Sequence, residues 1–199
     1  MPTRRAALLL PLAVAACGGP EPADVPPGPM GFTYLMPLPL NVVSIEMAEG
    51  GPPPQPGDVG ARLLPSPVEA VRIMGRDRLV AAGTTGEARF AVTQAALISG
   101  RDSLTCLLGC RLEILSAEGQ RMGFVEAQSR RAVNGTDATR PRAAEALLRR
   151  TMDDLNVEFE FQLRRSLRDW LVPMVPGPDG TLAPPPAPGG VTVEELPKT

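Results

Sequence analysis

The sequence predicts an α+β fold in which two helices pack on one face of a four-stranded mixed sheet, with proline-rich segments on either side. Apolar residues recur with strand and helix periods in the order strand, helix, three strands, helix (β-α-β-β-β-α). Prolines avoid this region: residues 68–172 contain only Pro141, whereas thirteen prolines lie between residues 20 and 67 and eight between residues 173 and 197. Because proline removes a backbone donor and fixes φ, its absence marks the ordered part of the chain.

The first strand is expected at residues 41–47, where apolar and polar residues alternate. The apolar residues 32–40 before it contain two prolines, so this segment is expected to lie extended along the domain. Residues 49–64 include three consecutive prolines and are expected to form a loop.

The first helix begins at a clear N-terminal signal. Ser66 can cap the helix, Pro67 suits its first position and Glu69 completes a capping box. An apolar stripe follows, and Gly83 is expected to end the helix. The stripe consists of Val68, Val71, Met74, Leu79 and Ala82.

Three further strands are expected at residues 87–98, 104–115 and about 121–133, because apolar residues alternate along each of them. Residues 116–120 have the composition of a hairpin turn between the last two strands. Residues 134–137 are expected to form a loop before the final helix.

One long helix is expected over residues 140–171. At 1.5 Å per residue it would extend roughly 45 Å, longer than a small domain is wide, so a projecting end or a bend is expected. Its apolar face has helical spacing and leads into the core. This face is formed by Ala144, Leu148, Met152, Leu155, Phe159, Leu163, Leu167 and Trp170.

Two further apolar residues of this helix, Val157 and Phe161, lie almost opposite Leu155 and Phe159 on the helical wheel. Two interpretations remain open. The apolar surface is either buried all round in the middle of the fold or exposed as a docking surface for a partner. The candidate partner- or ligand-binding residues are Val157, Phe161, Arg164, Arg165 and Arg168.

The first seventeen residues carry a targeting signal. Arg4 and Arg5 precede an apolar run over residues 6–14, and small residues then lead to Cys17. The run is too short to cross a membrane, which needs about 20 apolar residues, and is typical of a secretory signal. The alternatives are an ordinary signal with a chance cysteine and a twin-arginine signal.

The cysteine at the cleavage point resembles the lipobox of bacterial lipoproteins, a family in which this cysteine is acylated and becomes the first mature residue. The resemblance implies a lipid on Cys17 and a location on the periplasmic side of a bacterial membrane. Gly18 is not the aspartate that retains some lipoproteins in the inner membrane of enteric bacteria, so the outer membrane is favoured over the inner.

These observations divide the chain into four parts. Residues 1–16 are expected to be a signal peptide, and residues 17–31 a lipidated flexible tether. Residues 32–172 are expected to form a single α+β domain, and residues 173–199 a disordered tail rich in proline and glycine.

The residues that usually carry chemistry are scarce. The chain has no histidine, which is the commonest general base and metal ligand. Cys106 and Cys110 have no second cysteine pair to complete a metal site, and in a straight strand they would lie about 13 Å apart. Two buried thiols are favoured over a disulfide, which would need the backbone to fold back. No catalytic residue, metal or cofactor is expected apart from the covalent lipid.

Residues 68–172 contain sixteen arginines against fourteen acidic residues, so nucleic acid is not an expected partner. The arginines occur in groups, with acidic residues interleaved along the last helix. Solvated, mutually paired side chains are the simpler interpretation, and recognition of phosphates or anionic lipid headgroups is the alternative. The groups are Arg130–Arg131, Arg140 with Arg142, Arg149–Arg150, and Arg164–Arg165 with Arg168.

The element order resembles that of the LPS-assembly lipoprotein and of the auxiliary lipoproteins of ABC-type lipid transporters. This resemblance implies a non-catalytic accessory protein of an envelope transport or assembly complex. Direct binding of a lipid or another amphiphile between helices and sheet is a second hypothesis. An unusual hydrolase is a third, for which neither histidine nor an activated nucleophile is available.

Overall fold

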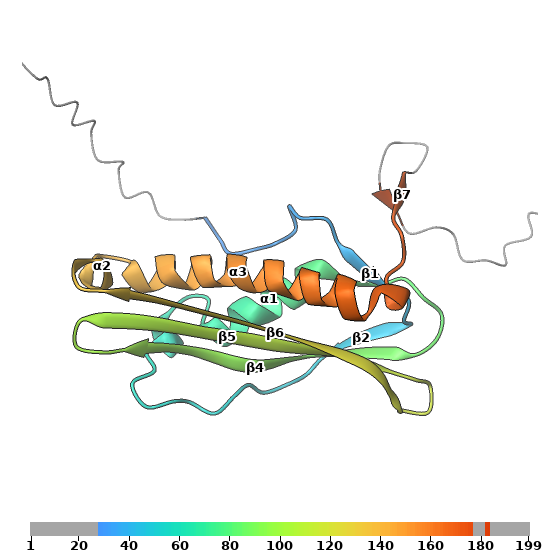
Figure 1. Ribbon diagram of the computed structural model, residues 1–199, viewed down its shortest axis with the longest axis horizontal. Coiled ribbons are helices and arrows are strands. Elements are labelled where there is room, and N and C mark those ends of the chain that lie inside the picture. The colour runs from blue at the N-terminus through green and yellow to red at the C-terminus, as the bar shows by residue number, and fades with distance from the viewer. Residues whose placement is uncertain (1–27, 177–181, 184–199) are drawn as a thin grey trace, which may run out of the picture.

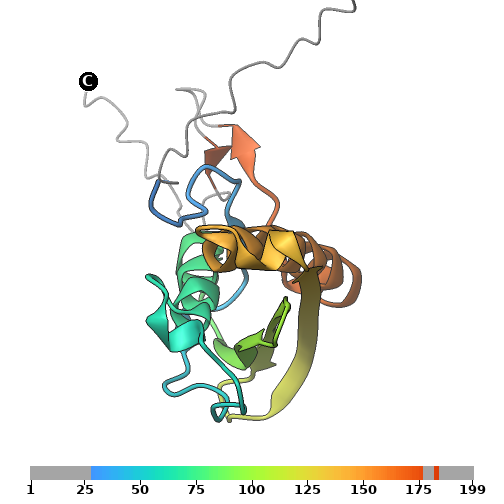
Figure 2. The ribbon, with the colours of Figure 1, turned by 90° about the vertical axis from the view of Figure 1, so that its left-hand side faces the viewer.

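The computed structural model describes residues 28–176 and 182–183. It confirms the α+β class: four strands form a mixed sheet in the order β2-β4-β5-β6, with β2 parallel to β4 and the remaining pairs antiparallel. Two helices cover one face of this sheet (Figures 1 and 2). The elements are β2 (Ser44–Met47), α1 (Pro67–Arg78), β4 (Glu87–Ser99), β5 (Ser103–Leu115), β6 (Arg121–Asn134) and α3 (Ala143–Ser166).

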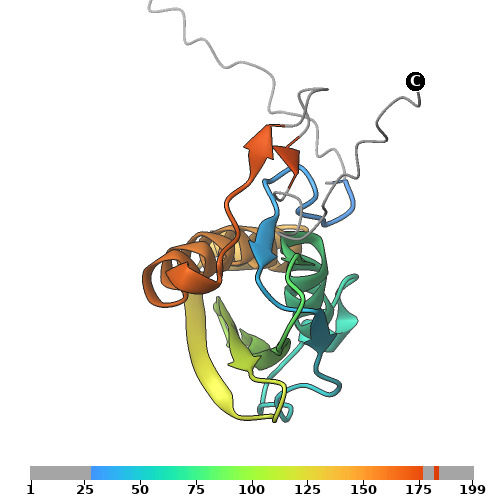
Figure 3. The same cartoon turned by 90° about the vertical axis from the view of Figure 1, so that its right-hand side faces the viewer.

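A second, two-stranded sheet brings together chain segments from near the beginning and the end of the described domain. β1 (Leu38–Leu40) pairs in parallel with β3 (Leu79–Ala81), and its other edge meets Leu171 in an antiparallel bridge. The Val172 amide donates to the Pro39 carbonyl at 2.9 Å. The chain therefore passes β1 as it leaves the end of α3 (Figure 3). The extended course expected for residues 32–40 is confirmed for residues 36–40, where Leu38–Leu40 form a strand that was not expected, whereas residues 32–35 form a turn closed by a hydrogen bond from the Leu35 amide to the Phe32 carbonyl.

The helix expected to reach Gly83 ends earlier, at Arg78, and the extension over residues 79–82 was wrong. Leu79 leaves the helix because residues 79–81 pair with β1. Gly83 does not end the helix but lies where two chain segments approach closely. A Cβ at this position would lie 2.4 Å from the carbonyl carbon of Asn41. Its amide donates to the Val42 carbonyl at 3.0 Å, so glycine permits this close approach of two chain segments.

The last helix is shorter than predicted at both ends. α3 starts at Ala143 because Arg142 adopts a left-handed conformation, with φ of 60° and ψ of 15°. The residues expected to form a loop include a short helix, α2 (Thr136–Thr139). After Ser166 the chain tightens into the 3₁₀ helix η2 (Arg168–Trp170).

The core lies between the helices and the sheet. The rings of Phe90 on β4 and Phe159 on α3 meet edge to face, with centroids 5.7 Å apart. Gly75 on α1 also packs against the Phe90 ring, since a Cβ at this position would lie 2.7 Å from the ring. Alternate residues of β5 complete the core, as the sequence predicted, and both cysteines are among them. These residues are Leu104, Cys106, Leu108, Cys110, Leu112 and Ile114.

The long strand β4 is protected where β2 stops. The loop before the 3₁₀ helix η1 (Gly60–Arg62) runs along its edge, and the Val59 amide donates to the Leu97 carbonyl at 2.8 Å. The Asp58 carboxylate accepts from the amides of Gly60 and Leu97 at 2.8 and 3.0 Å. This covers backbone groups that would otherwise form an open sheet edge.

Cys17 and the expected signal peptide lie outside the described residues. Of the expected tether, residues 28–31 are described: Met30 packs against the core, and Arg149 donates a hydrogen bond to the Gly28 carbonyl. Of the expected tail, β7 (Val175–Pro176) pairs with β8 (Leu182–Ala183). The chain therefore enters the described domain beside α3.

Candidate functional site

The predicted docking residues lie on the outer face of α3, which we call the outer ridge and define as Val157, Phe161, Arg164, Arg165 and Arg168, the last in η2. Val157 is 68% exposed and Phe161 is 54% exposed. Burial of both residues in the middle of the fold was therefore the wrong interpretation. The physical reason is that α3 buries the face that contains Leu155 and Phe159, whereas none of the described residues covers Val157 and Phe161 on the opposite face.

The three arginines of the outer ridge differ in their partners. Arg164 pairs with Glu160 at 2.8 Å, one helical turn earlier. Arg165 and Arg168 are exposed and form no ion pair with any residue between 28 and 176. All three lie at the C-terminal end of α3, where positive charge is favoured by the helix dipole. Two cations are therefore available beside the exposed apolar pair.

A groove of about 540 Å³ lies at this end of α3, between the helix and the chain segments that enter and leave the domain. Arg164 and Arg168 form one side. Its apolar lining includes Met36, Leu38, Leu171 and Met174. Of the predicted residues, the structure thus brings Arg164 and Arg168 together at a concave surface, whereas Val157 and Phe161 lie outside it.

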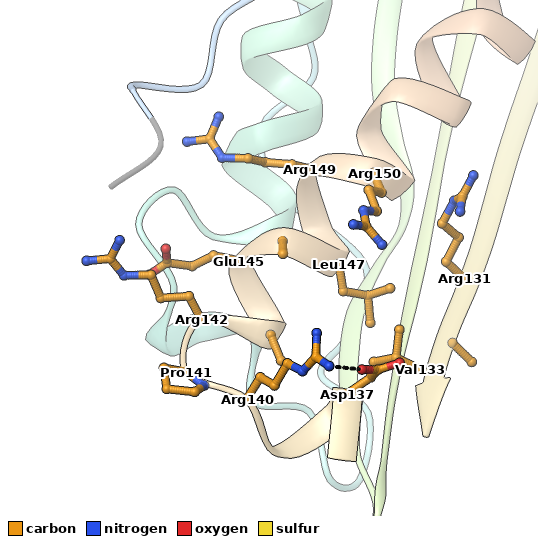
Figure 4. A pocket seen from close by; sticks show the side chains of 13 residues that line it. Arg131, Val133, Asp137, Arg140, Pro141, Arg142, Glu145, Leu147, Arg149 and Arg150 are labelled. Carbon is orange, nitrogen blue, oxygen red and sulfur yellow. Dashed lines mark ion pairs between the residues drawn. The ribbon is translucent and has the colours of Figure 1, made fainter. Parts of the chain in front are cut away.

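A second concave site lies at the opposite end of α3, where α2, the start of α3 and the end of β6 meet. It has a volume of about 360 Å³, and we call it the arginine pocket. Figure 4 shows Arg140 beside Asp137, and Arg150 extending on the same side of α3 as Leu147. The charged lining consists of Arg131, Arg140, Arg142, Arg149, Arg150, Asp137 and Glu145.

Only part of the arginine pocket is internally neutralised. Arg140 pairs with Asp137 at 3.2 Å, and Arg131 donates two hydrogen bonds to Asp154 on α3. Hydrogen bonding to Arg131 holds the pKa of the Asp154 carboxyl below its ordinary value. Arg150 is exposed and has no ion pair among the described residues. Pairing therefore accounts for some of these arginines, as expected from the sequence, but not for Arg150.

Sequence reasoning identified the arginine groups but missed their convergence. Arg131 belongs to a strand, Arg140 to a connection and Arg150 to a helix, and only the tertiary structure places them around one cavity. One signal in the sequence could have indicated a turn here. Pro141, followed by Arg142, interrupts the helical pattern between Arg140 and Arg150.

The two cysteines do not form a reactive site. Cys106 and Cys110 are free and buried, which confirms the preference for thiols over a disulfide. Burial raises the pKa of Cys106 to about 11 and that of Cys110 to about 12, so both are neutral thiols at physiological pH. Within residues 28–176 and 182–183, no group of three His, Cys, Asp or Glu side chains could hold a metal ion.

No helix in the described part of the chain is both long and apolar enough to cross a membrane.

No protein-family model matches the sequence, and no curated protein matches it significantly. The chain is distantly similar to several solved structures, three of which are described as lipoproteins. A candidate lipoprotein from Caulobacter crescentus is 15% identical, with a TM-score of 0.31, over 60% of this chain and 85% of the other. A minor lipoprotein from Acinetobacter baumannii is 17% identical, with a TM-score of 0.35, over 65% and 96%. A lipoprotein from Neisseria meningitidis is 8% identical, with a TM-score of 0.25, over 60% and 94%.

Proposed function

We propose that the chain is a lipid-anchored protein of the bacterial cell envelope that serves, without catalysis, as an accessory subunit of a transport or assembly complex. The anchor is Cys17, at the lipobox-like end of the signal sequence. The outer ridge of α3 is the surface on which the partner docks. The observation that carries the proposal is the exposure of Val157 and Phe161, one helical turn apart on a helix whose opposite face is fully packed.

The composition of the outer ridge matches that of protein interfaces. Aromatic and arginine side chains contribute most of the binding energy in such surfaces, and an exposed apolar pair with a charged rim is their usual arrangement. Phe161 supplies the aromatic ring, and Arg165 and Arg168 supply two cations beside it that form no ion pair within residues 28–176. The expected partner surface is therefore an apolar pocket with acidic residues on its rim.

The position of the anchor fits this proposal. Cys17 is eleven residues before Gly28, so the two lie within about 40 Å of each other even in a fully extended chain. Gly28 is bound by Arg149 of α3. The anchor therefore keeps Gly28, the point at which the chain enters the described domain, within this distance of the membrane surface, where the subunits of an envelope complex are found.

The test of docking is site-specific photocrosslinking in cells. A photoreactive phenylalanine at position 161 should crosslink to a defined subunit of an envelope transport or assembly complex, and V157S/F161S should abolish copurification of that subunit. Both residues are exposed, so the double variant should change the free energy of unfolding by less than about 1 kcal/mol.

The matched control is Met122, which is 56% exposed and belongs to β6 rather than to α3. A photoreactive residue at position 122 should give no crosslink to the subunit that position 161 captures. The variant M122S should leave copurification of that subunit unchanged. Equal crosslinking from positions 122 and 161 would contradict docking through the outer ridge. In parallel, mass spectrometry of the protein from the membrane fraction should find an acyl group on Cys17 that C17S lacks, and an unacylated Cys17 would contradict the lipid anchor.

Binding of an amphiphile is a second candidate function, favoured by the groove at the end of α3. Its apolar lining and two arginines suit a ligand with an acyl chain and an anionic group. Native mass spectrometry of the purified protein should then detect a bound lipid that M36S/M174S removes. If the protein carries no lipid and does not bind added fatty acid, amphiphile binding is contradicted, and docking is the one proposed function that remains for the C-terminal end of α3.

A further inference from the structure

We propose that the arginine pocket is a binding site for a phosphate group attached to an apolar moiety. This site is separate from the outer ridge and goes beyond the docking function. Arg150 and Arg164 lie fourteen residues apart on α3, which corresponds to about 21 Å along the helix axis. One ligand of modest size cannot contact both ends of the helix.

The charge of the pocket favours an anion. Figure 4 shows Arg131, Arg140 and Arg150 with Asp137 on one side of α3, a formal excess of two positive charges, whereas Arg142, Arg149 and Glu145 extend to the other side. Arginine presents several N–H donors in a planar fork that matches phosphate oxygens. The partners of Arg131 and Arg140 are exposed side chains, and exposed ion pairs are weak, so both guanidiniums can exchange a carboxylate for a ligand. Arg150 needs no exchange, since it has no ion pair in the described residues.

The floor of the pocket favours an apolar part next to the charged one. Between the arginines, the lining consists of aliphatic side chains rather than hydrogen-bonding groups, namely Ala132, Val133, Ala143, Ala146 and Leu147. Leu147 itself is 2% exposed and belongs to the core. A cavity of about 360 Å³ is at the lower end of the range for small-molecule sites. Its size suits a headgroup and the first few carbons attached to it.

The backbone at the pocket supports this interpretation. Arg142 is the only residue other than glycine with positive φ in the described part of the chain. Glycine or asparagine would adopt this conformation at lower cost, and such positions occur where function sets the backbone. Asp137 and Arg140 pair three residues apart just before this turn, and Arg142 and Arg149 extend to the other side of α3 (Figure 4).

The experiment is a titration of the full-length C17S chain, followed by NMR at the amides of residues 143–147 and the methyl groups of Leu147. The ligands are inorganic phosphate, soluble dihexanoyl phosphatidic acid, and vesicles of phosphatidylglycerol or of phosphatidylcholine. Dihexanoyl phosphatidic acid should bind more tightly than inorganic phosphate, because it also covers the apolar floor. Its shifts should be confined to residues around the pocket.

The decisive variant is R140Q/R150Q, which should weaken phosphatidic acid binding at least about tenfold, because hydrogen bonds between charged groups are the strong ones. The matched control R62Q/R101Q removes two exposed arginines outside the pocket and should change the affinity by less than about twofold. Equal weakening by both double variants would show that net charge alone attracts the ligand and would overturn the proposal. Absence of any saturable shift with phosphate and phosphatidic acid would overturn it as well.

The titrations with vesicles distinguish the two possible sources of the phosphate group. Binding to phosphatidylglycerol vesicles but not to phosphatidylcholine vesicles, lost in R140Q/R150Q, would identify a lipid headgroup in the membrane. Binding of soluble phosphatidic acid alone would identify a free phosphate-bearing amphiphile, and both results support the site. Failure of this test leaves the crosslinks from position 161 unaffected, so the site and the docking function are tested separately.

Discussion

Arg78, the last residue of α1, donates a hydrogen bond to Glu160 of α3, eighty-two residues later in the chain. The Arg78 side chain is only 2% exposed, and its Nε has no hydrogen-bond partner among the described residues. Burial raises the pKa of Glu160, but hydrogen bonds and charge from Arg78 and Arg164 outweigh this effect and hold the pKa below its ordinary value. Glu160 thus links the buried end of one helix to an arginine of the outer ridge.

Loss of Glu160 should therefore destabilise the fold. Removing one partner of a buried pair costs about 3–5 kcal/mol, because it leaves an uncompensated buried charge. Glu160 keeps 32% of its side-chain surface in water, so E160Q should cost less, about 2 kcal/mol, in urea unfolding. E158Q, on the same helix, should cost much less, since Glu158 accepts a hydrogen bond from Gln162 and forms no ion pair among the described residues. R78M/E160Q should be more stable than E160Q alone, and a double variant less stable than E160Q would contradict a buried, charge-paired Arg78.

Gly75 should not tolerate alanine, although alanine is the better helix former by about 1 kcal/mol. The new Cβ would lie 2.7 Å from the Phe90 ring, which is held in place by Phe159. Overpacking costs about 1–3 kcal/mol, so G75A should destabilise the protein by about 1 kcal/mol net in thermal or urea unfolding. In an F90L background the same substitution should cost less, and an unchanged cost would show that α1 does not pack on Phe90.

The cysteines should be protected from thiol reagents in the native protein. With pKa values of about 11 and about 12, Cys106 and Cys110 have almost no thiolate near neutral pH, and their side chains are buried. Alkylation at about pH 8, measured by mass spectrometry on the C17S chain, should be slower than in denaturant by on the order of a hundredfold. Rapid alkylation without denaturant would contradict the burial of this face of β5.

The pair between Arg131 and Asp154 should contribute to the pH dependence of stability. The pKa of Asp154 is lowered in the folded protein, so the stabilisation is present above the ordinary carboxyl pKa and is lost as the pH falls through the folded value. D154N should reduce the loss of stability between about pH 7 and about pH 3. Both side chains are more than 40% exposed, so solvent screening should keep the effect small. D153N, at the neighbouring residue, should leave the pH profile closer to that of the wild type.

Local patterns in the sequence were enough to predict much of the domain. The strands from Glu87 to Asn134 and the start of α1 at Pro67 follow from alternation and from a capping signal, both of which act over a few residues. Alternation also placed Cys106 and Cys110 on the buried face of β5. The errors lie where a distant segment competes with local preference: Leu79 leaves a helical pattern because it pairs with Leu38.

By itself, the sequence determined the α+β class, the buried thiols and the candidate anchor at Cys17, because each depends on residues close together in the chain. Only the tertiary structure decided which side of α3 meets water and which arginines share a cavity. The exposure of Phe161 depends on which part of α3 the other described segments cover, which no property of the helix reveals. The convergence of Arg131, Arg140 and Arg150 depends on how β6 lies against α3, a relationship between segments that local periodicity does not contain.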